Sequence, residues 1–334
     1  MKRMRVGLLL AALLSAALFS VYGRGNREAA AASGAKKVAV IFGLGGLGDK
    51  SFNDDGMTGL RRAQAELGIE FQYVEPKEIA EFEGHHRFFA RSREYDLIVG
   101  IGFDQADAIN VVAAEFPSQQ FVLIDGEANE TPSVASISFR DNEKTYLIGI
   151  IAALTSKTGR IGVVGGMDIP LINSFIAGYR AGALSVNPNI QVDIRYVGAW
   201  NDANTGKELA MSLYNSGADI VYAAAGGSGL GVFSAAADVN KLAIGADVNQ
   251  IPLDPDHIFL SSIRRVDNAV FNEIEKMVKG EFKGGRAVPG LKEGVVGYTV
   301  EGAKVITPQN IINQAEQAKQ DIISGKIIVP SALN

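Results

Sequence analysis

The sequence predicts an α/β protein made of two doubly wound lobes with parallel sheets. Short apolar runs rich in Val and Ile alternate with amphipathic segments of helix length along most of the chain. This alternation is typical of parallel sheets that helices cover on both faces. A strand–loop–helix phrase also occurs twice, and in each copy a Ser-Phe pair follows a glycine-rich loop. About 300 residues without the N-terminal segment are enough for two domains of roughly 150 residues.

The two copies of this phrase match in spacing. Phe52 lies fifteen residues after Lys37, which begins the first apolar run, and Phe175 lies fifteen residues after Arg160, which begins the second. A glycine follows each Phe after seven residues, inside an expected helix. The duplication predicts two similar lobes, each of which offers a loop and an aromatic ring to a shared cleft.

The elements follow from apolar periodicity and run length. We expect strands at 38–42, 71–74, 97–101, 121–124, 134–139, 161–164, 192–197, 220–223, 242–244 and 258–263. We expect helices at 57–67, 105–115, 172–186, 206–216 and 266–279. The segment 81–93, which carries the adjacent histidines His85 and His86, is expected to be exposed.

The first residues have the pattern of a secretory signal. Lys2, Arg3 and Arg5 precede an uncharged run at 6–21 made mostly of Leu and Ala, and small residues follow it. The run is shorter than the roughly 20 residues that span a bilayer as a helix. We therefore expect residues 1–32 to be a signal peptide that is removed on export, with an uncleaved anchor as the alternative.

Charge and cysteine content limit the possible partners. The net charge is −5, and it becomes −9 without residues 1–35, which carry five basic residues and one acidic residue. An acidic chain has no general attraction for nucleic acid or for anionic membranes. There are no cysteines, so disulfides, thiolate nucleophiles, cysteine-bound metals and a lipid on an N-terminal Cys are not expected.

Polar, aromatic and glycine residues gather directly after the expected strands. In doubly wound sheets, ligands bind beyond the carboxyl ends of the strands. The loop after the first strand reads Gly-Leu-Gly-Gly-Leu-Gly-Asp-Lys-Ser-Phe-Asn over 43–53. Further ligand-binding candidates follow later strands: Phe103, Asp104, Asp125, Trp200, Gly226, Gly227, Asp247 and Arg264.

The glycines at 43, 45 and 48 match the dinucleotide-binding pattern G-x-G-x-x-G, and Glu75 could act as its ribose-binding acid. In that motif the helix begins within the glycines, whereas here Asp-Lys-Ser-Phe-Asn intervenes before the apolar periodicity starts. We therefore interpret the glycines as a loop whose backbone amides can approach a ligand closely.

An ordered set of motifs resembles a known family. The set reads D-K-S-F-N at 49–53, S-F-I-A-G at 174–178, A-G-G-S-G at 225–229 with Gly-Val at 231–232, G-A-D at 245–247 and S-I-R-R-V at 262–266. Together these motifs resemble the basic-membrane-protein family of periplasmic-binding-type receptors, from Lys37 to the end of the chain. The best understood members are purine nucleoside receptors of ABC importers. The resemblance implies the type I binding-protein fold, in which three crossovers join the two lobes and the ligand lies in the cleft.

The resemblance also implies roles for the candidate residues. Asp49 and Asn53 would contact the edge of a purine base, and Phe52 would stack on its face. We expect Phe175, the duplicate of Phe52, to cover the opposite face, although helix–sheet packing is the alternative for this ring.

Carboxylates would bind the ribose hydroxyls. Asp104, Asp125 and Asp247 are the candidates, and Asp247 matches the family pattern best. The family usually has Lys where this chain has Arg264, which would keep such an acid ionised. Because Arg is planar and forked while Lys is a point charge, this difference could alter the ribose geometry or the ligand.

Three further residues complete the expected site. Gly226 and Gly227 would let the backbone approach the sugar, and Trp200 would line the cleft unless it is a core residue. Neither a metal nor a cofactor is expected, because the histidines do not converge on a metal-ligand set and no P-loop or G-x-S-x-G motif is present.

The resemblance gives the lobes their approximate limits. We expect lobe one to comprise 37–139 plus about 265–295, and lobe two to comprise 140–264 plus about 296–330. Hinges would lie near Phe139, Arg264 and Val295.

We expect a periplasmic, monomeric nucleoside receptor that closes on its ligand and docks on an ABC permease, without a lipid anchor because a lipobox cysteine is missing. The alternatives are a receptor for a sugar or signalling molecule on the same fold and a nucleoside hydrolase. Acidic residues at 81, 83, 141 and 143 could meet the permease but are expected to be a solvated surface. Which nucleoside is bound does not follow from the sequence.

Overall fold

Two six-stranded sheets form the framework of the computed structural model, which describes residues 34–333. The signal segment expected at 1–32 lies outside the described residues. Among the residues described, no helix combines the length and apolarity needed to cross a membrane.

The first sheet has the strand order β11-β5-β4-β3-β1-β2, and all of its neighbouring strands are parallel. Its strands are β1 (Lys37–Ile41), β2 (Glu70–Val74), β3 (Leu97–Ile101), β4 (Gln120–Ile124), β5 (Val134–Ile137) and β11 (Gly285–Ala287). The order reverses between β1 and β3, so the loops that follow these two strands diverge and leave room for a ligand.

The second sheet repeats this plan with the order β12-β10-β9-β8-β6-β7. Its strands are β6 (Arg160–Gly165), β7 (Gln191–Tyr196), β8 (Ile220–Ala224), β9 (Leu242–Gly245), β10 (Ile258–Arg264) and β12 (Val296–Thr299). Five strands are parallel, and β12 pairs antiparallel with β10. The predicted parallel arrangement therefore holds for five of the six strands, and β12 is an antiparallel strand added at the edge. Both edge strands β11 and β12 were missed because they are short and contain glycine.

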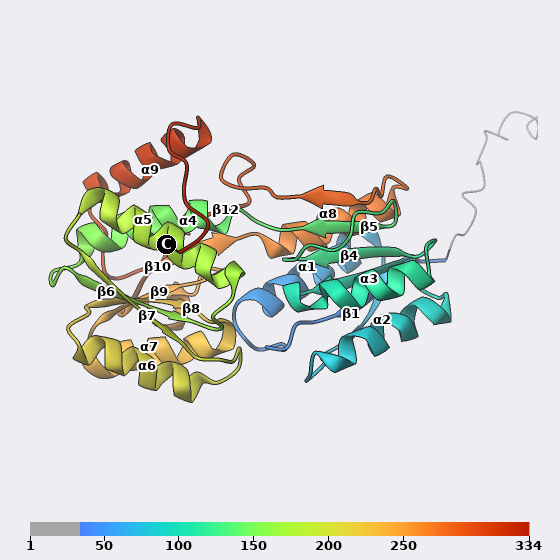
Figure 1. Ribbon diagram of the computed structural model, residues 1–334, viewed down its shortest axis with the longest axis horizontal. Coiled ribbons are helices and arrows are strands. Elements are labelled where there is room, and N and C mark those ends of the chain that lie inside the picture. The colour runs from blue at the N-terminus through green and yellow to red at the C-terminus, as the bar shows by residue number, and fades with distance from the viewer. Residues whose placement is uncertain (1–33, 334) are drawn as a thin grey trace, which may run out of the picture. The chain divides into compact units, whose positions relative to one another are not determined.

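Helices cover both faces of each sheet (Figure 1). Around the first sheet lie α1 (Phe52–Leu67), α2 (Ala80–Ser92), α3 (Ala106–Glu115) and α8 (Val266–Val278). Around the second lie α4 (Asp141–Thr155), α5 (Pro170–Val186), α6 (Ala203–Asn215), α7 (Leu230–Val239) and α9 (Gln309–Ile323). The chain therefore passes between the sheets three times: after β5, after β10 and after β11. The predicted α/β fold of two lobes is confirmed.

Alternation along β1 distributes its side chains between two cores. Val38 and Val40 pack in the cluster that contains α1 and α8, whereas Ala39 and Ile41 pack in the cluster that contains α2 and α3. Successive residues of a strand point to opposite faces, so an uninterrupted apolar run means that both faces are covered.

The two glycines of the duplicated phrase have the same structural role. A Cβ on Gly59 would lie 2.3 Å from the carbonyl oxygen of Asp267, and a Cβ on Gly182 would lie 2.0 Å from that of Tyr146. Gly59 thus lets α1 pack closely on α8, and Gly182 lets α5 pack closely on α4. In both lobes a glycine-bearing helix packs on the helix that enters from a crossover.

Two local expectations were wrong. The helix expected from residue 57 begins at Phe52. The carboxylate of Asp49 accepts hydrogen bonds from the N–H groups of Asn53 and Asp54 in the first turn, and this turn precedes the apolar periodicity from which the helix was predicted. His86 is not on an exposed segment but fully buried on α2, where its Nε2 lies 2.9 Å from Gln105 Oε1. Burial lowers the pKa of His86 to about 4, so the ring is neutral at pH 7.

Candidate functional site

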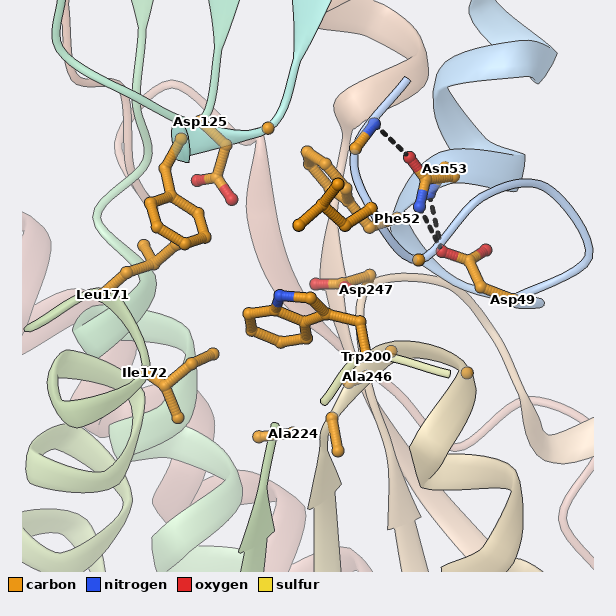
Figure 2. A pocket seen from close by; sticks show the side chains of 18 of the residues that line it. Asp49, Phe52, Asn53, Asp125, Leu171, Ile172, Trp200, Ala224, Ala246 and Asp247 are labelled. Carbon is orange, nitrogen blue, oxygen red and sulfur yellow. Dashed lines mark hydrogen bonds between the residues drawn. The ribbon is translucent and has the colours of Figure 1, made fainter. Parts of the chain in front are cut away.

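All twelve candidate residues line one pocket between the carboxyl ends of the two sheets (Figure 2). The first lobe contributes the loops after β1, β3 and β4, and the second contributes the loops after β7, β8 and β9 together with the start of α5 and the end of β10. The empty space between these residues is about 640 Å³, part of it open to solvent.

Asp49 and Asn53 brace the loop that follows β1. Asp49 accepts hydrogen bonds from the backbone N–H groups of Ser51, Asn53 and Asp54 at 2.9, 2.9 and 3.2 Å. The side chain of Asn53 donates to Asp49 at 3.1 Å and accepts from the N–H of Gly43 at 3.1 Å. Figure 2 shows the bonding between Asn53 and Asp49 at the edge of the pocket. Much of the hydrogen-bonding capacity of both side chains is therefore used within the protein.

A buried charge cluster lies between the lobes. Arg264 is 2.8 Å from Asp125, 3.0 Å from Asp247 and 3.4 Å from Asp141. Lys144 is 2.7 Å from Asp141 and 3.6 Å from Asp247. Three carboxylates thus surround two cations, and all five side chains are at most 7% exposed.

Asp125 and Asp247 differ in protonation although they share Arg264. Burial raises the pKa of Asp125 to about 7, in spite of the opposing effect of Arg264. The pKa of Asp247 is lowered, because Arg264, Lys144 and a hydrogen bond from Ser51 together outweigh the effect of burial. Asp247 is therefore the ionised member of the pair, and Asp125 is the member that takes up a proton near neutral pH.

The aromatic rings fall into two groups. The guanidinium group of Arg264 lies among three phenylalanine rings, with distances to the ring centres of 5.0 Å for Phe52, 5.5 Å for Phe139 and 5.3 Å for Phe175. The ammonium group of Lys144 lies 4.4 Å from the centre of the Phe175 ring. Phe175 is 2% exposed and belongs to the core. It lies in the second turn of α5, whereas Phe52 is the first residue of α1.

Phe103 and Trp200 form the other aromatic pair, with centroids 6.4 Å apart and an angle of 68° between the ring planes. Both are half-buried. Phe103 comes from the short 3-10 turn η1 (Phe103–Gln105) of the first lobe, and Trp200 follows β7 of the second. Trp200 contacts Gly166, where a Cβ would lie 2.3 Å from the indole. Figure 2 shows the indole in the middle of the pocket view.

The carboxylate of Asp104 accepts a hydrogen bond from its own backbone N–H but has one oxygen without a partner among the described residues. Among residues 34–333, no group donates a hydrogen bond to its buried Oδ1. Burial raises the pKa of Asp104 to about 6, and no charged side chain contributes to this shift. The charge cluster is therefore electrostatically separate from Asp104, although both line the same pocket.

Direct hydrogen bonds hold the two lobes together beside the pocket. Ser51 Oγ donates to Asp247 at 2.9 Å and to the carbonyl oxygen of Ala246 at 3.3 Å. Gln250 Nε2 donates to the carbonyl oxygen of Lys50 at 2.9 Å. Together with the Arg264–Asp125 pair, these bonds connect the loop before α1 and the end of β4 to the second lobe.

The sequence analysis missed some residues of the site. Lys144 was not considered, and Asp141 was assigned to a solvated acidic surface, which was wrong because its side chain is 0% exposed. The spacing of Asp141 and Lys144 at i and i+3 on one helix was the available signal. Leu171 and Ile172, apolar residues of the pocket wall, carried no signal that separated them from core residues. Among the described residues, no group of His, Asp or Glu side chains could hold a metal ion.

Comparison with known proteins identifies the architecture. A family model described as ABC transporter substrate-binding protein PnrA-like matches residues 35–332. The chain belongs to this family. It is 35% identical to the ABC transporter nucleoside-binding protein BmpA of Lactococcus lactis subsp. cremoris over 317 residues, which cover 88% of this chain and 89% of the relative. It is 34% identical to the CD4+ T-cell-stimulating antigen of Listeria monocytogenes over 315 residues, which cover 88% and 87%.

A solved solute-binding protein of an ABC transporter system from Aeropyrum pernix K1 is similar in structure, with a TM-score of 0.83 and 32% identity over 90% of this chain and 94% of that chain. The resemblance to the basic-membrane-protein family and the type I binding-protein fold are thus confirmed.

As a member of this family, the chain is an exported solute-binding protein of an ABC transporter and not an enzyme. Its partners are a small-molecule ligand and an ABC permease. The hydrolase alternative is therefore wrong.

Proposed function

We propose that this protein captures a nucleoside, with a purine base, between its two lobes and delivers it to the permease. The observation that carries the proposal is the division of one pocket into an aromatic part and a buried charged part. A nucleoside has the same two halves: a flat base with π-faces and a sugar with vicinal hydroxyls. The Lactococcus lactis relative is named as a nucleoside-binding protein, which supports the same ligand class.

The base would lie against Phe52 and the Phe103–Trp200 pair. Stacking on an aromatic ring contributes roughly 0.5–1.5 kcal/mol beyond the buried area. We propose Trp200 rather than Phe175 as the ring from the second lobe, because cations lie against Phe175 and its side chain is buried in the core. Phe175 would then not contact the ligand. It would instead help to position Lys144 and Arg264, which lie against its ring.

The sugar would bind at the charge cluster. Asp247 is ionised and lies at the pocket wall, so it can accept hydrogen bonds from two hydroxyls, and Arg264 can donate to a hydroxyl oxygen. Gly226 and Gly227 follow β8 without side chains that would keep the sugar away from the backbone. A sugar or signalling-molecule receptor remains the second candidate, since the charge cluster alone would suit a polyol.

Ligand binding would favour the closed arrangement of the lobes. Groups from both lobes contact the ligand together only when the lobes are closed, so binding shifts the population toward closure. Ser51 and Asp247 are already hydrogen-bonded across the lobes, and the crossovers near 139, 264 and 295 would act as hinges. The lobe limits given by the sequence, 37–139 with 265–295 and 140–264 with 296–330, are part of this proposal.

We further propose that the protein acts as a monomer in a periplasm, without a lipid. The printed sequence contains no cysteine, whereas relatives from Pyrococcus furiosus and Pyrococcus horikoshii carry the word lipoprotein in their names. Partition into the aqueous phase of a cloud-point detergent would support this part of the proposal, and partition into the detergent phase would contradict it.

Calorimetric titration tests the ligand class. The exported protein is recovered from cells, freed of ligand by unfolding and refolding, and titrated with guanosine, inosine, adenosine, cytidine and ribose. Micromolar or tighter binding of purine nucleosides, with intact nucleoside recovered afterwards, would support the proposal. Binding of ribose alone would favour the polyol receptor, and no binding of any nucleoside would overturn the assignment.

A further inference from the structure

We infer that Asp104 reads the Watson–Crick edge of the base and makes guanosine the preferred nucleoside. This inference rests on the proposed function and assigns Asp104 to the base rather than to the ribose. It follows from three properties of the pocket: the unpartnered carboxylate oxygen Oδ1 of Asp104, the hydrogen bonds that Asp49 and Asn53 make within the protein, and the position of Asp104 beside the aromatic pair.

The first property is an unsatisfied acceptor. Asp104 Oδ1 is buried, and none of the described residues donates to it. An unpaired buried carboxylate oxygen is costly to leave without a donor. Because Asp104 lines the pocket, a ligand that carries N–H groups can supply that donor.

The second property removes the other candidates for the base edge. Asp49 already accepts three backbone hydrogen bonds, and Asn53 uses its carbonyl oxygen and its amide nitrogen within the loop. Both side chains thus stabilise the start of α1. Of the three polar side chains at this end of the pocket, Asp104 keeps the most free hydrogen-bonding capacity.

The third property is location. Asp104 directly follows Phe103, whose ring meets Trp200 at 6.4 Å between centroids. Its Oδ1 lies next to Gly102, 3.0 Å from the position of a Cβ there, and the Cα of Gly43 lies 3.4 Å from the same position. Asp104 is therefore at the end of the pocket formed by the β1 and β3 loops. The charge cluster around Arg264, where the sugar would bind, makes no contribution to the pKa of Asp104.

The turn that carries Asp104 is held from behind. Gln105 Nε2 donates to the carbonyl oxygens of Ile41 and Ile101, both at 3.0 Å, and the oxygen of its amide faces His86 Nε2. These buried bonds tie η1 to the ends of β1 and β3. Because the turn is already ordered before the ligand binds, little free energy is spent on ordering it, and Asp104 stays in one position. A fixed acceptor distinguishes better between bases with different hydrogen-bonding groups.

The chemistry of a carboxylate then selects among the purines. An ionised carboxylate only accepts hydrogen bonds, and guanine presents two adjacent donors, N1–H and the N2 amino group. Hypoxanthine presents N1–H alone. Adenine presents the N6 amino group beside N1, whose lone pair would face a carboxylate oxygen. The expected order of affinity is guanosine, then inosine, then adenosine, with guanosine at least about tenfold tighter than adenosine because charge-assisted bonds are strong.

The variant Asp104→Asn tests the inference by a reversal of preference. A carboxamide has one acceptor group and one donor group, which match N6–H and N1 of adenine; at the other edge of the base, Asn matches N6–H and N7 in protein–DNA contacts. The same amide would set its N–H group against a donor of guanine. We expect guanosine to bind about 10- to 100-fold more weakly to the variant, and adenosine to bind as well as or better than it does to the wild type.

Asp107→Asn is the matched control. Asp107 lies one helical turn further along, is exposed and does not line the pocket, so the same change of charge should leave all three affinities unaltered. Thermal unfolding of each variant checks that it is folded. If Asp104→Asn does not fold, the wild-type order of affinity still tests the inference.

The outcomes separate the two proposals. If no nucleoside binds the wild type, the proposed function fails. If nucleosides bind but guanosine is not preferred, or if Asp104→Asn weakens guanosine and adenosine equally, the proposed function stands and the assignment of Asp104 is overturned. A guanosine preference that Asp104→Asn removes or reverses would support the assignment.

Discussion

Asp125 and Asp247 occupy matching positions in the two lobes. Each follows the corresponding strand of its sheet, β4 or β9, and each has a left-handed backbone, with φ of 70° and 69°. Non-glycine residues rarely adopt this conformation, and Asp and Asn tolerate it best. Arg264 lies 2.8 Å from Asp125 and 3.0 Å from Asp247. One arginine at the second crossover thus connects equivalent points of both lobes.

Replacing Arg264 by Met should destabilise the protein strongly. The change leaves Asp125, Asp141 and Asp247 buried with Lys144 as their remaining cation. Removal of one partner from a buried ion cluster typically costs about 3–5 kcal/mol, so thermal unfolding should shift down by at least about 5 °C. Arg264→Lys should recover part of the loss.

Lys304→Met is the control for this variant. Lys304 pairs with Asp256 at 2.8 Å, but both side chains are more than half exposed, and exposed pairs contribute about 0–1 kcal/mol. Equal effects of the two substitutions would contradict the structural role assigned to Arg264.

Asp125→Asn should change how stability depends on pH. The pKa of Asp125 is about 7 in the folded protein and about 3.9 in the unfolded chain. The folded state therefore binds the extra proton. Its contribution to stability is fully present below pH 4 and is lost as the pH rises through about 7. Asn keeps the left-handed backbone but does not titrate.

The measurement is the difference in unfolding free energy between the wild type and Asp125→Asn from pH 4 to pH 8. The wild type should lose stability relative to the variant as the pH rises, by at most about 1.4 kcal/mol per pH unit. Other groups, such as Asp55 with a pKa raised to about 7 and His86 with a pKa lowered to about 4, affect both proteins equally. A difference that is independent of pH would show that Asp125 does not titrate in this range.

The sequence was sufficient to predict where the pocket lies but not how its side chains are used. Polar residues directly after buried strands must meet at the same edge of a parallel sheet, which is why residues as distant as Asp49 and Arg264 were found together. The hydrogen bonds that Asp49 makes within the protein depend on the conformation of the loop between β1 and α1. This conformation cannot be predicted from the spacing of residues in the sequence.

The duplicated phrase was informative in one respect and misleading in another. The second glycine of each copy, Gly59 or Gly182, has the same packing role in both lobes. Phe175 does not repeat the position of Phe52, because α5 begins five residues before Phe175 whereas α1 begins at Phe52. Matching spacing in the chain therefore did not produce matching positions on the helix.

Trp200→Ala should weaken nucleoside binding more than it weakens the fold. The indole is half-buried and faces Phe103, so its loss removes one stacking surface and the apolar area beneath the base. We expect affinity for purine nucleosides to fall at least about tenfold. Phe175→Leu should instead lower the unfolding temperature, because it alters a buried core position beside Lys144. If Phe175→Leu weakens nucleoside binding more than Trp200→Ala does, Phe175 rather than Trp200 is the second stacking ring.

Gln105→Met should reduce both stability and selectivity. The substitution keeps the side-chain volume but removes the donor to the carbonyl oxygens of Ile41 and Ile101 and the acceptor for His86. Buried groups left without partners cost about 1–3 kcal/mol, and η1 would no longer hold Phe103 and Asp104 in place. We expect a lower unfolding temperature and a smaller ratio of guanosine to adenosine affinity.

Gln119→Met is a matched control for Gln105→Met. Gln119 Nε2 also donates to two carbonyl oxygens, those of Tyr95 and Gln120, at 3.2 Å, but it is half-buried and lies outside the pocket. This control should lower stability slightly and leave the affinity ratio unchanged. A loss of stability in Gln105→Met with an unchanged ratio would mean that the turn keeps its geometry without the glutamine, and that the bonds behind Asp104 serve the fold alone.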